Sequence, residues 1–487
     1  MQSFPLLSLA IWIPILFGAA VLLIGSDRNP RPARWLALIG SIVGLLLTIP
    51  LITGFDNHIA AAQFVERLNW IPEFDISYHL GLDGVSLWLV ALTAFTTLII
   101  VIASWRVITV HVAQYLAAFL FLSGLMIGAF AALDGMLFFV FFEATLIPMY
   151  LLIGGWGGTK RVHAAFKFFL ISLVGSLLML IAMLYLFGQS NSFDIASWYA
   201  LRLGFVPQVL IFIGFFAAFA VKVPMWPIHT WLPEVHLEAP TGASVILGML
   251  KLGAYGFIRF TLPITPEASH FFAPVMIALS LVAVIYGSLV ALSQTDMSRL
   301  MAYSSISHMG LVTLGLFIFN QYGIEGAIVQ MISYGFISGA MFLCIGVLYE
   351  RTHTRAIDAY GGVASVMPKF AVLTMLFAMA NVGLPGTSGF VGEFLVIMGA
   401  IKFNFWIGAL AALTLILSAA YTLSMYKRTI FGSVGNDNVA RLVDIGKREL
   451  IMLGAMAAFV LLIGVNPRPF TDAIDSSVTT LLSQTQR

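Results

Sequence analysis

Long apolar segments with very few charges dominate this sequence of 487 residues. Hydrophobic residues make up 60% of the chain and charged residues only 9%, a balance that soluble globular proteins do not have. An apolar window of about 20 residues has the length of a helix that crosses about 30 Å of hydrocarbon. The windows are continuously apolar instead of alternating, which argues against a membrane β-barrel. The sequence therefore predicts an all-α polytopic membrane protein.

Fourteen such windows are present, and each predicts one transmembrane helix. An even number of crossings places both termini on the same side of the membrane. The windows lie near residues 4–25, 33–54, 82–104, 113–132, 134–154, 162–188, 207–226, 241–262, 271–294, 300–319, 323–350, 369–400, 405–431 and 448–466.

Lysine and arginine are distributed unevenly between the two sets of loops. Most follow odd-numbered windows, as in residues 28–34, 160–167, 351–369 and 427–448, and few follow even-numbered windows. The positive-inside rule assigns the richer set to the cytoplasm. We therefore expect a multi-pass protein of the bacterial inner membrane with both termini in the periplasm.

Two of the predicted helices should be broken. The seventh runs into Lys-Val-Pro-Met-Trp-Pro at residues 222–227, and the twelfth contains Gly-Leu-Pro-Gly-Thr-Ser-Gly at residues 383–389. Irregular backbone at membrane depth survives only where it is buried in protein or lines a cavity. The breaks lie five helices apart, which suggests two five-helix units, helices 4–8 and 9–13. Because five is odd, the second unit starts on the opposite side of the membrane, as in an inverted repeat. The predicted parts are residues 1–110 (helices 1–3), 111–265 (first repeat), 266–432 (second repeat) and 433–487 (helix 14 and tail).

Four charged residues lie inside these apolar segments: Glu143, Lys222, Lys251 and Glu393. A charge at the bilayer centre costs about 2.5–3.5 kcal/mol, so such side chains must pair, face water or change protonation. Two acids and two bases placed in this way favour a path for protons or another ion.

Glu143 and Lys222 belong to the same predicted repeat and could form an ion pair. Burial disfavours the charged lysine and a nearby carboxylate favours it, so the pair could control whether Lys222 holds a proton. The alternative is a static pair that joins helices, although a buried pair seldom adds stability. Lys251 lies in the middle of window 8 and could relay protons, or it could extend towards the membrane surface.

His308 and Glu393 lie in the second predicted repeat. His308 occupies the place that corresponds to Glu143, and its unperturbed pKa near 6.5 suits a relay between Lys251 and Glu393. Glu393 follows the break in helix 12 and could be the exit site. The simpler interpretations are a hydrogen-bonded core histidine and a carboxylate that satisfies broken backbone.

Other polar residues give weaker signals. Residues 227–238 hold two histidines but lack the His-Glu-x-x-His spacing, so we expect a hydrated loop there and no metal site. Asp83 and Asp134 each precede a helix and should cap it. The single cysteine, Cys344, excludes disulfides and multi-cysteine metal centres. No motif for a phosphate, a nucleophile or haem is present, so no cofactor is expected on this chain.

Six segments together resemble the antiporter-like subunits of respiratory complex I, the proton-pumping NADH:quinone oxidoreductase. Within that family, the glutamate at position 393 is typical of one branch, because the related L and N subunits and the sodium/proton antiporter subunits typically carry a lysine there. The segments are residues 80–86 (LGLDGVS), 142–150 (FEATLIPMY), 220–233 (AVKVPMWPIHTWLP), 238–241 (EAPT), 302–310 (AYSSISHMG) and 384–394 (LPGTSGFVGEF).

The resemblance implies a fourteen-helix core whose proton path uses Glu143, Lys222, Lys251 and Glu393. It implies a non-redox subunit that moves protons from cytoplasm to periplasm, driven by redox chemistry elsewhere. NADH, FMN, iron–sulfur clusters and quinone would be held by other subunits. L-type and N-type antiporter-like subunits would be its neighbours, with lipids around them and no nucleic acid. A sodium/proton antiporter subunit, a subunit of a membrane-bound hydrogenase and a passive scaffold are the alternatives.

Overall fold

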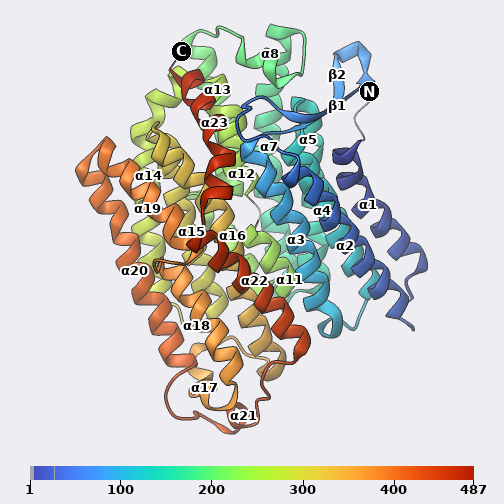
Figure 1. Ribbon diagram of the computed structural model, residues 1–487, viewed down its shortest axis with the longest axis vertical. Helices are drawn as coiled ribbons and strands as arrows, with labels where there is room; N and C mark the ends of the chain where they lie inside the picture. Colours follow the sequence, from blue (N-terminus) through green and yellow to red (C-terminus); the bar gives the residue numbers. More distant parts are fainter. Residues whose placement is uncertain (1–4, 27, 250, 487) are drawn as a thin grey trace.

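The computed structural model describes residues 5–26, 28–249 and 251–486, and these form a tall bundle of helices (Figure 1). The first residue of the predicted window 4–25 lies outside the described residues. The helices are α1 (Leu6–Ile24), α2 (Arg31–Thr53), α3 (Gly84–Val107), α4 (Val112–Ala131), α5 (Gly135–Ala144), α6 (Leu146–Trp156), α7 (Arg161–Ser190), α8 (Ile195–Tyr199), α9 (Phe205–Lys222), α10 (Trp231–Glu238), α11 (Thr241–Met249), α12 (Leu252–Gly256), α13 (Leu262–Ile264), α14 (Pro266–Leu292), α15 (Met297–Phe317), α16 (Gln321–Thr352), α17 (Val363–Val366), α18 (Pro368–Val382), α19 (Ser388–Phe403), α20 (Phe405–Thr429), α21 (Asp437–Ala440), α22 (Lys447–Val465) and α23 (Arg468–Thr485).

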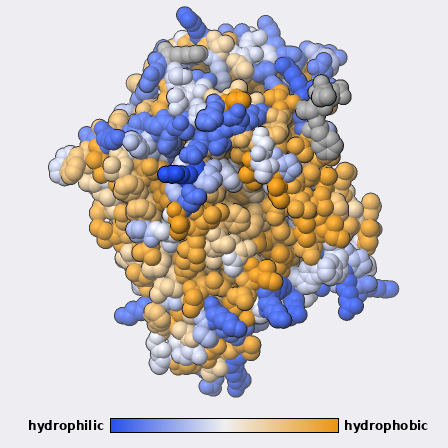
Figure 2. All heavy atoms as spheres, in the orientation of Figure 1, coloured by the Kyte–Doolittle hydropathy of each residue, from blue (hydrophilic) through white to orange (hydrophobic). Residues whose placement is uncertain are grey.

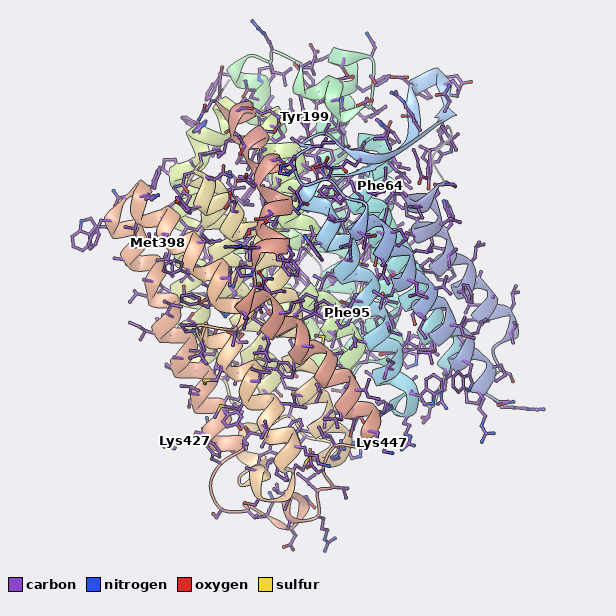
Figure 3. The ribbon with its side chains drawn as sticks, in the orientation of Figure 1. Phe64, Phe95, Tyr199, Met398, Lys427 and Lys447 are labelled. Carbon is purple, nitrogen blue, oxygen red and sulfur yellow. The ribbon has the colours of Figure 1, made fainter. Side chains whose placement is uncertain are left out.

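Both termini lie at the same end of the bundle, which we call the termini end (Figure 1). At the opposite end lie α17, α21 and the labelled side chains of Lys427 and Lys447 (Figure 3). Apolar side chains form a wide band around the middle, and polar side chains gather at both ends (Figure 2). This pattern is that of a protein whose middle lies in hydrocarbon.

Thirteen helical segments in the described part of the chain are long and apolar enough to cross a membrane. The remaining predicted window, 369–400, is present as two shorter helices, α18 and α19. The all-α polytopic class is therefore confirmed, whereas the inverted relation of the two repeats stays a prediction. α15 and α16 are almost wholly buried and form the centre of the bundle, while only about a third of the residues of α2 and of α20 are buried.

Both predicted helix breaks are present. α9 ends at Lys222, and the indole N–H of Trp231 at the start of α10 donates to the carbonyl of Val221 (3.1 Å), which holds α10 against the broken end. α18 ends at Val382 and is capped by Gly383, whose φ of +84° favours glycine. A Cβ at Gly383 would lie 2.7 Å from a carboxylate oxygen of Glu393, so glycine also lets that carboxylate approach the break.

The eighth predicted transmembrane helix, residues 241–262, differs from its prediction. It was expected to run unbroken through Lys251, but the backbone of Lys251 has non-helical angles (φ −107°, ψ 16°), and α12 begins only after it. A π-helical segment follows at Phe257–Thr261 and leads into α13. Such segments widen the helix and are frequent at functional sites. Lys251 therefore lies at a third interruption, which the sequence did not indicate.

Two structures at the termini end were not predicted. Strands β1 (Gln63–Ile71) and β2 (Ile76–Leu82) pair antiparallel in a hairpin, a small exception to the all-α class. α23 is amphipathic: one face is buried against α3 and α16, and the other carries hydroxyl and carboxylate groups. Three short 3₁₀ helices lie at Pro72–Phe74, Ile228–Thr230 and Ile357–Ala359.

Candidate functional site

Lys222 ends α9 inside the bundle, where its residue is only 9% exposed. Its ammonium group lies 5.0 Å from the centre of the Phe142 ring and 5.4 Å from that of Phe168. Aromatic faces attract a cation weakly and cannot replace a counter-ion. The charge of Lys222 thus depends on nearby water and on the acid of α5.

Glu143 on α5 is that acid. Its charge interacts with that of Lys222, but no direct salt bridge joins these two described residues. Both carboxylate oxygens of Glu143 are buried and accept no hydrogen bond from a described protein group. Ser176 is a neighbour, but it donates its hydroxyl to the carbonyl of Leu173 (3.0 Å). Glu143 and Lys222 therefore interact through their charges and not through a salt bridge, and the carboxylate of Glu143 lacks a hydrogen-bond donor among the described protein groups.

A small cavity of about 30 Å³ connects Lys222 with Lys251. A water needs about 10–15 Å³ of such space, so the cavity has room for about two. His236 on α10 lines the cavity, and both its ring nitrogens are buried without a partner in the described protein. Ser305 and Met309 of α15 line its other side. Polar groups without protein partners mark this as a hydrated space.

Lys251 lies at the far side of this cavity and is 3% exposed. Its ammonium group donates to the carbonyl of Gly248 at 2.6 Å and lies 3.5 Å from the sulfur of Met309. It also lies 5.2 Å from the centre of the Tyr334 ring on α16. No carboxylate pairs with it among the described residues. Lys251 is thus a buried base whose one firm partner is a helix-end carbonyl.

His308 and Glu393 meet at the centre of the second half of the bundle. Nδ1 of His308 on α15 lies 2.8 Å from Oε1 of Glu393 on α19, and the side chains are 0% and 1% exposed. The amide of Gln330 on α16 donates to the same carboxylate oxygen at 3.3 Å. The relay partner expected for His308 is therefore in direct contact with it.

Hydroxyl groups extend this centre towards Lys251. The Tyr421 hydroxyl lies 3.3 Å from Nε2 of His308 and 2.9 Å from the Ser304 hydroxyl. Tyr334 bonds to Ser304 and to Ser305, each at 3.2 Å. Because Lys251 lies over the Tyr334 ring and Ser305 lines its cavity, polar groups follow one another from Lys222 to Glu393.

The expectation of a loop at residues 227–238 was wrong, because this stretch is mostly helical. His229 and His236 are buried at 4% and 1% exposure. His236 stacks on Phe342 at 4.3 Å between ring centres. One sequence signal could have identified His236. It lies seven residues after His229, which is about two helical turns, on a segment next to a broken helix.

A cavity of about 670 Å³ opens at the end opposite the termini. Arg448 lines it, next to Lys447, which Figure 3 shows at that end. Glu238 at the end of α10 and Thr241 at the start of α11 also line it. α10 and α11 therefore run from this large cavity to the small one between the lysines, since His236 and Gly248 line the latter.

The arrangement can hold and pass protons, because it alternates bases, acids, hydroxyl groups and space for water. No cluster of three metal-binding side chains occurs within the residues that the structure describes.

Comparison with known proteins supports one family. Residues 132–418 match the family described as NADH:quinone oxidoreductase/Mrp antiporter, TM. NADH-quinone oxidoreductase subunit M of Rhodobacter capsulatus is 46% identical over 98% of this chain and 96% of the relative. NADH-ubiquinone oxidoreductase chain 4 of Arabidopsis thaliana is 43% identical over 98% of this chain and 97% of the relative.

Solved structures agree. A chain in the structure of respiratory complex I from Thermus thermophilus with bound NADH superposes with a TM-score of 0.90 and 34% identity, covering 98% of this chain and 99% of that one. A chain of the Mrp complex from Dietzia sp. DQ12-45-1b matches with a TM-score of 0.82, covering 96% of this chain and 52% of that one; at 21% identity it shows the fold alone.

The bundle and its buried acids and bases define an antiporter-like membrane protein. More particularly, the chain belongs to the NADH:quinone oxidoreductase/Mrp antiporter family, and relatives similar to it over its full length carry the name subunit M or chain 4. This is the branch that the glutamate at position 393 predicted.

Proposed function

We propose that this chain is a membrane-arm subunit of a proton-translocating NADH:quinone oxidoreductase and that it moves protons through the buried residues described above. The observation that carries the proposal is the series of polar side chains and water space that runs from Lys222 past Lys251 to Glu393 in an otherwise apolar bundle. Such residues are costly in a membrane and persist where they transport charge.

Protons would enter from the end opposite the termini, where the 670 Å³ cavity reaches α10 and α11. The excess of lysine and arginine in loops at this end supports a cytoplasmic assignment, with both termini in the periplasm of a bacterial inner membrane. His236 and about two waters would carry protons from Lys222 to Lys251.

From Lys251, the proton would pass the hydroxyl groups of Ser305, Tyr334, Ser304 and Tyr421 to His308. The contact between His308 and Glu393 would complete the transfer, because one partner can accept a proton as the other releases one. Glu393 lies beside the break at Gly383 and would be the site from which protons leave, because irregular backbone at membrane depth is buried in protein or lines a cavity.

Coupling to neighbouring subunits would act through the charge of Glu143. At an effective dielectric of 20, unit charges interact by about 4 kcal/mol at 4 Å and about 2 kcal/mol at 8 Å. Because no salt bridge fixes Glu143 to Lys222, a small movement of α5 or a neutralised carboxylate changes how well Lys222 retains its proton.

The energy would come from redox chemistry in other subunits, so this chain would be a non-redox subunit. NADH, FMN, iron–sulfur clusters and quinone would be bound elsewhere in the complex. The other partners are membrane subunits of the same complex, and we expect L-type and N-type antiporter-like subunits on either side, with lipids around them.

The test is Lys251→Met in the intact complex, with proton pumping and NADH-to-quinone turnover measured in inverted membrane vesicles. We expect both to fall by at least about tenfold, because positioned acid–base groups contribute on the order of 10²-fold or more. Lys402→Gln, at an exposed lysine of α19, is the matched control. Wild-type pumping in the Lys251 variant, or transport that requires sodium, would contradict the proposal.

A further inference from the structure

An ion pair lines a second large cavity, at the termini end. Arg259 Nη2 lies 2.7 Å from Oδ2 of Asp83, and their side chains are only 13% and 11% exposed. Both residues line a cavity of about 500 Å³, together with Tyr199, which Figure 3 shows at the termini end. A cavity of this size holds on the order of ten or more waters.

Tyr255 connects Lys251 with Arg259. Its amide donates to the carbonyl of Lys251 at 3.0 Å, so these two residues lie one turn apart. Tyr255 is fully buried and donates its hydroxyl to the carbonyl of Phe130 at 2.8 Å. The Arg259 Nε donates to the same hydroxyl at 3.1 Å. Tyr255 thus links the residue that holds the central base to the arginine that lines the cavity.

The backbone around Arg259 is arranged to hold the guanidinium in place. Arg259 lies in the π-helical segment, and its carbonyl accepts a hydrogen bond from Tyr199 at 2.7 Å. Asp83 is fixed as the cap of α3, where Oδ1 accepts from the amides of Val85 and Ser86. The acid predicted to be a helix cap thus has a second role, since its other oxygen binds arginine.

The other charged groups of this cavity are already paired. Asp194 lies 3.4 Å from Nδ1 of His79 and 3.5 Å from Nη1 of Arg67. Arg259 is therefore the cation that lines this cavity and is linked through Tyr255 to Lys251. A guanidinium stays charged at physiological pH, and fixed positive charges of this kind exclude protons from water-filled pores.

We propose that Arg259, held by Asp83, is an electrostatic seal that prevents protons on Lys251 from leaving through the termini-end cavity. The seal directs protons to His308 and Glu393 and prevents their return from the cavity. The inference rests on the proposed function, because it assumes that Lys251 holds a transferable proton. The competing explanation is that the ion pair only holds α3 against the π-helical segment Phe257–Thr261.

The test measures the passive decay of an imposed pH gradient in liposomes that contain the complete complex, without NADH. The decisive variant is Asp83→Asn combined with Arg259→Gln. Its neutral side chains can still hydrogen-bond and leave no unpaired buried charge, so assembly is expected. We expect its proton leak to rise at least about threefold, and its pumped protons per electron to fall while turnover continues.

Asp83→Asn alone separates a seal from a clamp. Asparagine still caps α3 and the guanidinium keeps its charge, so the seal predicts a leak no greater than that of wild type. Arg259→Lys keeps the positive charge, so its proton leak should also stay at the wild-type level. Arg202→Gln, at an exposed arginine of the same end, is the matched control. The proposal would be overturned if the double variant leaked no more than wild type, or if Asp83→Asn alone leaked as much as the double variant.

Adding Lys251→Met to the double variant distinguishes the two possible failures. If the leak disappears, Lys251 supplies the protons that Arg259 blocks, and both proposals are supported. If the leak persists, the cation still blocks this cavity but protons reach it by a route that bypasses Lys251, which contradicts the seal as proposed. If Lys251→Met alone pumps normally, the proposed function fails whatever the leak.

Discussion

Nδ1 of His308 lies 2.8 Å from Oε1 of Glu393, with both side chains almost completely shielded from solvent. The two residues come from different helices, α15 and α19, and the break before α19 allows the contact. Gly383 leaves room for the carboxylate, and Gln330 fixes one of its oxygens. A buried acid and base at this separation can exchange a proton directly.

Glu393→Gln should stop this exchange without removing the side chain. Glutamine keeps the shape and can bond to Gln330, but it cannot take a proton from His308. We expect quinone-linked proton pumping to fall at least about tenfold, since positioned acid–base groups contribute on the order of 10²-fold or more. The measurement is pumping in inverted vesicles at equal complex content, with the exposed Glu267→Gln as control.

A double-mutant cycle tests whether His308 and Glu393 act as one unit. Once Glu393→Gln has broken the transfer, His308→Gln should cost little more, so the combined loss of pumping should be smaller than the product of the single losses. Residues in contact typically show coupling of about 0.5–3 kcal/mol. Independent effects of the two changes on the pumping rate would argue that they belong to different steps.

His236→Phe tests the hydrated cavity between Lys222 and Lys251. Phenylalanine preserves the stacking on Phe342 but removes the two ring nitrogens that lack protein partners, so the cavity becomes apolar and less hydrated. Pumping and turnover should fall together, severalfold or more. His229→Phe is the matched control, because His229 is buried on the same connection but does not line this cavity.

The termini end should lose a local interaction only in acid. The hydrogen bond from His79 holds the pKa of Asp194 below its usual value, with help from the Ala196 amide and the charge of Arg67, against the effect of burial. A lowered acid pKa adds stability above the unfolded value of about 3.9, and that stability is lost as pH falls through the folded value.

Between about pH 5 and 7 the Asp194 contribution should therefore be constant, and it should fade below about pH 4. Asp194→Asn should weaken hydrogen-exchange protection of the β2 amides near His79 at pH 6 and abolish the acid dependence. Exchange rates corrected for their intrinsic pH dependence provide the measurement. Protection that is equal in variant and wild type at pH 6 would show that the interaction does not hold the hairpin.

The all-α polytopic class was predictable because its cause is local. Each apolar window is long enough to cross hydrocarbon, and the prolines and glycines near Lys222 and Gly383 break helices wherever they occur. The four charged site residues were also identifiable, since charge in an apolar segment is costly enough to need an explanation. Family motifs then gave these positions their expected roles.

Contacts between distant segments were not predictable in the same way. Serine and tyrosine are tolerated in membrane helices, so Tyr334 and Tyr421 gave no signal although they connect Lys251 with His308. The break at Lys251 involves no proline, and helix 8 was therefore expected to be continuous. Asp83 was interpreted as a cap alone, because its partner Arg259 is 176 positions away along the chain.

The central claim is that the charge of Lys222, controlled by Glu143, is a coupled proton site. The most direct measurement is proton pumping and quinone-linked turnover in membranes that carry Lys222→Ala or Glu143→Gln. Complex assembly and NADH oxidation by an artificial acceptor are checked in the same samples. The account predicts normal assembly with pumping and turnover that collapse together. Wild-type turnover and pumping per electron in both variants would contradict it and would make these charges structural.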